Sequence, residues 1–215
     1  MWNKARRLVN INTDAFTIIE VLMAMVIVGV VIGAIYGVFV SSNRSYHTQD
    51  NVADAQQRVR VGIDFMVREI RMAGFDPMGP ATDTHPLDSD GAGIKEATAS
   101  KIRFTSDTDM NGVIDNPKKQ ERITYEYDVD DRRLRRCLYE GTGSQSWQTL
   151  IYNVGALQFT YLDADGNTIT TPVAADGLDD IRTVAISITV EGEDAPGGTI
   201  ARTLNTRVSC RNLSL

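Results

Sequence analysis

Nine residues in the middle of the chain, DTDMNGVID at 107–115, have the spacing of oxygen ligands around a divalent cation. The candidate ligands fall at positions 1, 3, 5, 7 and 9 of a calcium loop: Asp107, Asp109, Asn111, Val113 through its carbonyl, and Asp115. Position 12 holds Lys118 instead of the usual bidentate Glu, so Glu121 or a group from elsewhere must supply the missing oxygen. The pattern predicts a weak Ca²⁺ site, and the alternative is an acidic surface turn.

Glu20 is the second residue whose chemistry needs an explanation, because it is the single charged residue between Phe16 and Asn43. A carboxylate in hydrocarbon is unfavourable unless it is paired. It is tolerated if it lies near the membrane surface or carries a proton. A further alternative is cleavage before Phe16, which would create an amino group about one helical turn from Glu20. The amine of one copy could then pair with Glu20 of a neighbouring copy.

The segment that carries Glu20 has the length of a membrane-spanning helix. Residues 21–43 contain no charge and are long enough to cross a hydrocarbon layer of about 30 Å. Lys4, Arg6 and Arg7 precede the segment, which favours a cytoplasmic N-terminus and an exported C-terminal region. A secretory signal has an apolar core of about 7–15 residues and then a cleavage site, so it fits this longer run poorly.

Residues 44–74 continue the helix with a different pattern. No proline interrupts residues 16–73, and Gly74 is a suitable C-terminal stop. Apolar residues recur at intervals of three and four, at Val52, Ala55, Val59, Ile63, Met66, Val67, Ile70 and Ala73. This apolar stripe predicts that the second half of the helix packs permanently on a globular domain.

The region after Gly74 is predicted to be rich in β-strands. An irregular connection comes first, and alternating segments then predict strands at 101–105, 122–128, 133–139, 156–163, 183–191 and 199–210. The stretch YDVDDRR would join 123–127 to 134–138 in a hairpin, and DADGNT at 163–168 would form a second turn. The predicted fold class is α+β, with one long helix packed on an antiparallel sheet domain.

Composition limits the function classes. The net charge of −6 argues against a nucleic-acid partner, which needs a basic surface. His47 and His85 have no metal ligands at suitable spacing on a regular element, and no nucleophile motif is present, so an enzyme is not predicted. Cys137 and Cys210 both follow the apolar segment, and an even pair in an exported region favours a disulfide. The alternative is two unrelated buried thiols.

The stretch AFTIIEVLMAMVIVGVVIGA at 15–34 resembles the N-terminal segment of type IV prepilins and type II secretion pseudopilins. Their pattern is Gly-Phe-Thr-Leu-Ile-Glu before an apolar helix. Residues 16–20 match it position by position, whereas Ala15 stands in place of the Gly. The resemblance implies that a prepilin peptidase cuts between Ala15 and Phe16 and methylates the new amino group of Phe16. It also implies that Glu20 acts in assembly.

The order of elements resembles the minor pilins of the PilW type and, more distantly, the minor pseudopilin J of type II secretion. The supporting stretches are REIRMAGFDP, the predicted hairpin and the late VSCRNL. The implied parts are a leader (1–15), a membrane and filament-core helix (16–43), its amphipathic continuation (44–74) and an exported domain (75–215).

This resemblance implies a structural subunit of a pilus tip or initiation complex. The subunit would reside in the bacterial inner membrane and then in a pilus, which can serve adhesion. Its implied partners are other minor and major pilins, the prepilin peptidase and the inner-membrane assembly platform. The alternatives are a minor pseudopilin, which would serve secretion, and, less favoured, a membrane-anchored periplasmic enzyme.

Overall fold

The computed structural model describes residues 16–83, 91–115, 119–194 and 198–214. The predicted leader with Ala15, and also His85 and Lys118, lie outside these residues, as does the side chain of His47. The chain divides into two compact units, Met1–His47 and Thr48–Leu215, and the boundary falls inside the long helix.

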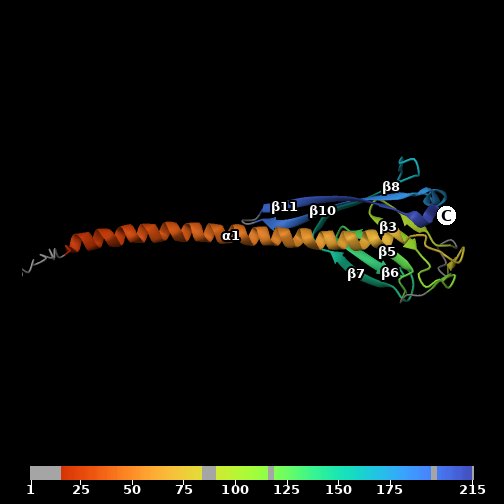
Figure 1. Cartoon of the computed structure of the whole chain (residues 1–215), viewed down its shortest axis with the longest axis horizontal. Coiled ribbons are helices and arrows are strands. Elements are labelled where there is room, and N and C mark those ends of the chain that lie inside the picture. Colours follow the sequence, from red (N-terminus) through yellow and green to blue (C-terminus); the bar gives the residue numbers. More distant parts are fainter. Residues whose placement is uncertain (1–15, 84–90, 116–118, 195–197, 215) are drawn as a thin grey trace, which may run out of the picture. The chain divides into compact units, whose positions relative to one another are not determined.

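Helix α1 runs from Ile18 to Arg71, close to the predicted 16–73 (Figure 1). In the first unit most of its side chains are apolar and exposed, and Ile18–Tyr46 is long and apolar enough to cross a membrane. The helix ends where predicted, because Gly74 has a positive φ of 78° and donates its N–H to the Thr105 carbonyl at 3.0 Å.

The part of α1 in the second unit buries the predicted apolar stripe. Of the described stripe residues, Val67 is half-buried and the others are buried, namely Val59, Ile63, Met66, Ile70 and Ala73, whereas the polar residues Arg60, Asp64, Arg68 and Arg71 are exposed. At Gly62 the helix packs closely on Ile151. A Cβ there would lie 2.8 Å from Cδ1 of Ile151, so a larger residue would force that side chain to move.

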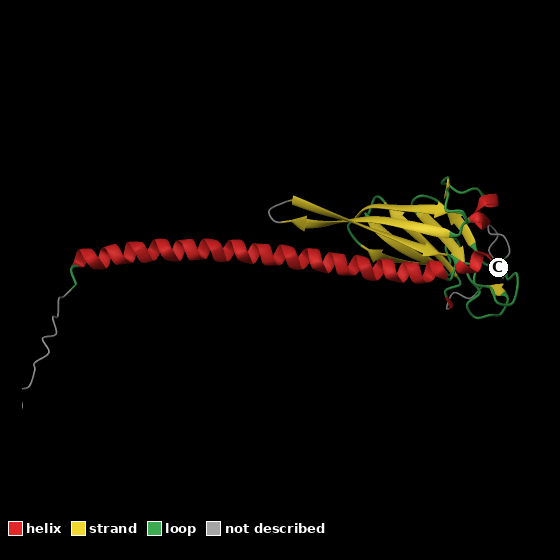
Figure 2. Cartoon of the chain, turned by 45° about the horizontal axis from the view of Figure 1, so that its top comes forward, coloured by secondary structure: helices red, strands yellow, loops and turns green. Residues whose placement is uncertain are grey.

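Most strands of the second unit belong to two antiparallel sheets (Figure 2). The five-stranded sheet contains β2 (Ile94–Ala97), β3 (Lys101–Thr105), β5 (Arg122–Asp128), β6 (Arg133–Leu138) and β7 (Ser146–Ile151), in that order. The four-stranded sheet contains β8 (Val154–Leu162), β9 (Thr168–Ile169), β10 (Thr183–Asp194) and β11 (Gly198–Ser209), in the order β11-β10-β8-β9. The single predicted sheet is therefore two sheets.

Short elements complete the unit. β1 (Thr82–Asp83) pairs in parallel with β4 (Val113–Ile114). Two 3₁₀ helices follow later in the chain, η2 (Ala175–Asp180) and η3 (Arg211–Ser214). η3 lies against the end of α1, where Asn212 donates through Nδ2 to the Arg71 carbonyl and the Leu213 side chain occupies the space that a Cβ on Gly74 would fill.

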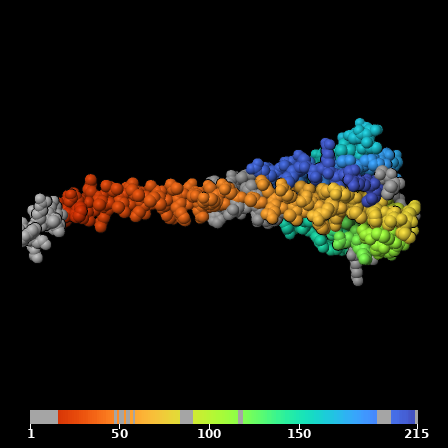
Figure 3. Space-filling view, viewed as in Figure 1, coloured from red at the N-terminus to blue at the C-terminus, as the bar shows by residue number. Residues whose placement is uncertain are grey.

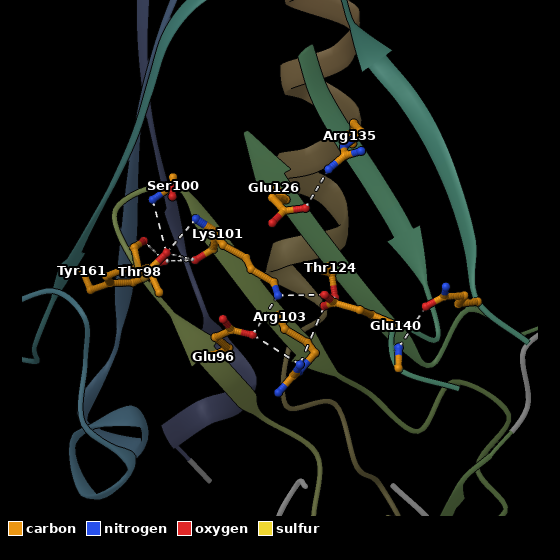
Figure 4. Close-up of polar contacts among 12 residues, drawn as sticks. Glu96, Thr98, Ser100, Lys101, Arg103, Thr124, Glu126, Arg135, Glu140 and Tyr161 are labelled. Atoms are coloured by element: carbon orange, nitrogen blue, oxygen red, sulfur yellow. Dashed lines mark hydrogen bonds and ion pairs between the residues drawn. The ribbon is translucent and has the colours of Figure 1, made fainter. Parts of the chain in front are cut away.

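The two large sheets and α1 share one apolar core. Its largest buried side chains include Phe104 and Tyr125 from the first sheet and Phe159, Tyr161 and Ile186 from the second. The Tyr161 hydroxyl donates to the carbonyls of Thr98 and Lys101 in the β2–β3 hairpin (Figure 4). Burial of these aromatic and aliphatic side chains stabilises the packing of the layers.

Candidate functional site

The N-terminus of α1 is capped by two residues that hydrogen-bond to each other, Thr17 and Glu20. The carboxylate of Glu20 accepts hydrogen bonds from the Thr17 N–H at 2.9 Å and from its hydroxyl at 2.8 Å. The Thr17 hydroxyl in turn accepts the Glu20 N–H at 3.4 Å. This is a capping box, in which a Thr and a Glu three residues apart satisfy the first N–H groups of a helix. The spacing T-x-x-E could have been found in the sequence.

Phe16 and Glu20 lie on the same side of α1. They begin a shallow groove along the first unit that is also lined by Val21, Ala24, Met25, Val28, Gly29 and Ile32. Phe16 itself is 85% exposed. The predicted cleavage and methylation at Phe16, and the predicted pairing of Glu20 with a neighbouring amine, stay predictions.

The acidic loop brings together three carboxylates. Oxygen atoms of Asp107, Asp109 and Glu121 lie within 4.8 Å of one another, and the side chains of Asp107 and Glu121 are fully buried. The loop closes through Asp107, whose two oxygens accept the N–H groups of Asn111 at 3.2 Å and Gly112 at 2.9 Å. Glu121 therefore occupies the place of the acid that the calcium pattern lacked at position 12.

The other predicted ligands have different roles in the loop. The side-chain oxygen of Asn111 accepts the Val113 N–H at 2.7 Å. Asp115 meets Glu121 through its backbone, since its N–H donates to Oε2 of Glu121 at 3.2 Å. The Tyr139 hydroxyl donates to the same oxygen at 3.2 Å. Asp115 does not belong to the described group of converging carboxylates.

The donor set fits a hard cation. Like charges that converge in a buried place destabilise one another unless a cation or a proton compensates them. Calcium takes six to eight oxygen ligands, so Asp107, Asp109 and Glu121 would supply the charge and carbonyls or water the remainder. Calcium binding stays a prediction, with Glu121 as an added ligand.

The predicted disulfide is absent, because Cys137 and Cys210 are both free and buried. Cys137 lies on β6 next to Arg136, whose side chain contacts α1, and neighbouring residues of a strand face opposite sides of the sheet. Cys210 follows β11 and belongs to the core. The two thiols therefore face different sides of the domain, which the sequence alone could not show. Burial raises the pKa of each thiol to about 11.

The sequence analysis missed a polar contact that fastens α1 to the five-stranded sheet. Arg136 donates through Nε to Glu69 Oε2 at 2.8 Å and through a second nitrogen to Oε1. The same guanidinium donates to Gln120 at 2.7 Å and stacks over the Phe65 ring. The Tyr125 hydroxyl also donates to Glu69. The contact could not be predicted from the sequence around Arg136, because its partner Glu69 lies 67 positions away.

Burial decides how these groups titrate. Burial first, and then the Glu69 carboxylate, raise the pKa of Tyr125 far above its ordinary value. Burial alone would lower the pKa of Arg136, but its hydrogen bonds and attraction to Glu69 outweigh burial and raise it. The network is thus an ion pair with a neutral phenol donor.

The opposite face of the same sheet carries a network of half-buried charges (Figure 4). Lys101 binds Glu140 at 2.8 Å and Glu96 at 3.2 Å, and Arg103 binds Glu96 at 3.2 Å. Arg135 contacts Glu126 at 3.1 Å and stacks over the Trp147 ring. Alternating charges across strands stabilise a sheet face in water.

Comparison with known protein families gives two matches. Residues 12–36 match the prokaryotic N-terminal methylation motif. Residues 48–210, more than half of the chain, match prepilin peptidase-dependent protein B. No curated protein matches the chain.

Proposed function

The chain belongs to the prepilin peptidase-dependent protein B family of type IV pilin-like proteins, and from this premise we propose that it is a minor pilin. The observation that carries the proposal is that one helix contains both a membrane-length segment and a segment packed on the sheets. α1 begins with the methylation motif and a membrane-length apolar segment, and it ends fastened to the sheets through Glu69 and Arg136. Such a subunit acts by assembly with other pilins.

Processing comes first in the proposed sequence of events. The basic leader keeps the N-terminus in the cytoplasm, and the apolar part of α1 anchors the precursor in the inner membrane. The prepilin peptidase then cuts between Ala15 and Phe16 and methylates Phe16. Ala is the smallest replacement for the usual Gly, so the site still offers a short side chain before the cut.

Glu20 has two successive partners in this proposal. In the single subunit, Thr17 donates two hydrogen bonds to its carboxylate, so the charge is solvated by the helix start. During assembly, the amine of Phe16 from a neighbouring subunit supplies the cation. The gain from pairing two charges away from water favours one register of the subunits.

The ion pair between Glu69 and Arg136 explains how the domain follows the helix. When α1 leaves the membrane, contacts between the helix and the sheets keep the domain folded on the helix as it moves. The bidentate pair and the close packing of Gly62 on Ile151 supply those contacts. The domain, on the outside of the filament, then joins a tip or initiation complex with other minor and major pilins on the inner-membrane assembly platform.

The intact mass of the chain recovered from membranes tests processing. We expect a chain that begins at Phe16 and carries one added methyl group, and its loss in a strain without the peptidase. A chain that retains residues 1–15 would contradict the proposal. Deletion of the gene then separates the two pilin-like roles, since a minor pilin is needed for piliation and a minor pseudopilin for secretion.

A further inference from the structure

A groove lies between α1 and β7, the strand at one end of the five-stranded sheet. In Figure 3, the teal atoms of the region that includes β7 lie directly below α1. The groove has a volume of about 770 Å³. Val61 and Phe65 of α1 line one side and are 62% and 39% exposed, whereas residues 148–153 line the other side. Successive residues of a strand point to opposite faces of a sheet, so a groove lined by four successive residues of β7 reaches the edge of the strand.

The outer edge of β7 is open. β7 pairs only with β6 among the described strands, and no other backbone hydrogen bond joins residues 146–151 to a described residue. An edge strand turns every second N–H and C=O group away from its neighbour, so β7 offers a row of donors and acceptors. One bulge, around Leu150, interrupts its pairing with β6. The strand lacks the lysine and proline that commonly protect an edge, since residues 141–155 contain no charge and no proline.

The exposed side of α1 beside the groove is basic. Arg60, Arg68 and Arg71 are exposed there, and Asp64 is the single exposed acid among the described side chains of α1 in the second unit. None of the three arginines forms an ion pair with a described residue. Arg68 lies three positions after Phe65, so it borders the apolar side of the groove. The helix dipole favours cations in the last turn, where Arg68 and Arg71 lie, but it does not account for Arg60.

The charged residues that line the groove are already paired. Arg136 binds Glu69, and Glu191 binds Arg132. A segment in the groove would therefore meet an uncharged strand on one side and a surplus of positive charge on the other. Charge complementarity selects an acidic occupant. The β7 edge of a second copy does not meet this requirement, because it carries the same uncharged strand and the same basic helix.

We propose that the β7 edge binds an extended, acidic segment of a different subunit, which adds to the sheet as a further strand. In this mode of recognition, backbone hydrogen bonds supply the affinity and side chains supply the specificity. Apolar side chains of the segment would pack on Val61 and Phe65, and its carboxylates would pair with Arg60 and Arg68. The inference rests on the proposed function, in which the subunit acts by assembly, and it specifies the chemistry of one partner.

Hydrogen exchange of the full chain in detergent tests strand addition. The probe is a short synthetic peptide of Val, Thr and Glu, and the control peptide carries Lys in place of Glu. We expect the acidic peptide to slow the exchange of backbone N–H groups in residues 146–151 about tenfold, as measured by mass spectrometry. The control peptide should have little effect. An acidic peptide with Pro at every second position should also have little effect, because proline cannot donate to a strand ladder.

Charge reversal on α1 tests the source of the selectivity. Arg60→Glu with Arg68→Glu should weaken binding of the acidic peptide about tenfold and strengthen binding of the lysine peptide, because the border of the groove then becomes acidic. Arg207→Glu, at an exposed position on β11, is the matched control and should change neither. Binding that does not protect residues 146–151, or that is unaffected by the α1 reversals, would overturn the inference. Protection of these residues by phosphatidylglycerol vesicles without peptide would assign the surface to a membrane and would overturn it as well.

A photoreactive amino acid at Gln148, an exposed residue of the groove, tests for the partner in membranes. We expect an adduct with an acidic segment of a different subunit, identified by mass spectrometry, and a lower yield in the α1 reversal. An adduct with β7 of a second copy, or a yield no higher than with the probe at exposed Val129, would overturn the inference. A methylated chain that fails to bind the acidic peptide would overturn only this inference. A chain that is never cleaved before Phe16 would overturn the proposed function, and the exchange experiment would still report on β7.

Discussion

Glu69 of α1 and Arg136 of β6 share two hydrogen bonds, and the side chains are only 14% and 5% exposed, respectively. Removal of one partner would leave a buried charge without compensation. We expect Arg136→Met to lower the free energy of unfolding by about 3–5 kcal/mol. Urea titration of the detergent-solubilised chain, followed by near-ultraviolet circular dichroism, measures this loss.

Two further variants distinguish the effect of an unpaired buried charge from the effect of losing any arginine. Glu69→Met together with Arg136→Met should recover most of the stability, because neither charge is then buried alone. Arg133→Met removes an exposed pair with Asp131 and should cost less than about 1 kcal/mol. Equal losses for Arg133→Met and Arg136→Met would contradict the anchoring role of the buried pair.

Glu20→Ala should leave the chain in the membrane and folded but reduce its incorporation into filaments, because the carboxylate that meets the neighbouring amine is gone. Quantitative immunoblots of sheared filaments against membranes measure this ratio. Thr17→Ala is the matched control. It removes the capping hydroxyl and keeps the carboxylate, so it should retain more incorporation. If Glu20→Ala and the wild type assemble equally, Glu20 has no assembly role.

Millimolar calcium should raise the unfolding temperature of the chain. For a weak site, at about 10 times the dissociation constant, the gain is about 1.4 kcal/mol, or about 3–6 °C for a domain of this size. Asp107→Asn and Glu121→Gln should each abolish most of the shift, as measured by thermal unfolding with calcium and with chelator. Asp165→Asn changes an acid in another turn and should keep it. A shift unaffected by Glu121→Gln would exclude Glu121 as a ligand.

Cys137 and Cys210 should react slowly with thiol reagents at pH 8, because burial both hinders access and raises their pKa to about 11. The sign of the pH dependence follows. As the pH rises, thiols of the unfolded chain, with an ordinary pKa of 9.0, lose their protons at lower pH than the folded thiols do. The free energy of unfolding therefore decreases as the pH rises from about 9 to 11. Mass spectrometry after alkylation in denaturant should find two modified thiols. A mass without alkylation would indicate a disulfide.

Elements defined by local pattern could be predicted from the sequence. The long helix follows from the absence of proline and from the apolar stripe, and the described stripe residues are buried except Val67, which is half-buried. The predicted hairpin has the register Ile123 to Leu138 and Tyr127 to Leu134, as alternation on both strands requires. The turn at 163–168 forms with Gly166 at a φ of 84°.

The remainder depends on contacts between distant residues. β7 was missed because residues 146–151 have no clean alternation and the strand is stabilised by pairing with β6. The side of the sheet that Cys137 faces depends on the strand register, which the sequence does not give. The count of two cysteines therefore predicted a disulfide that the structure lacks. Glu121 was recognised only as one option, since its approach to Asp107 and Asp109 depends on the fold of the loop.

The cap at the end of α1 has a consequence for the order of events during synthesis. Asn212 reaches the Arg71 carbonyl across 141 positions of sequence. A ribosome makes the helix first and the segment that closes it much later, after every strand of both sheets. Until residue 213 has emerged, the end of the helix lacks the side chain of Leu213 that packs on Gly74. Because contacts between distant residues form more slowly than local ones, this end of the helix is expected to be completed after the local hairpins have formed.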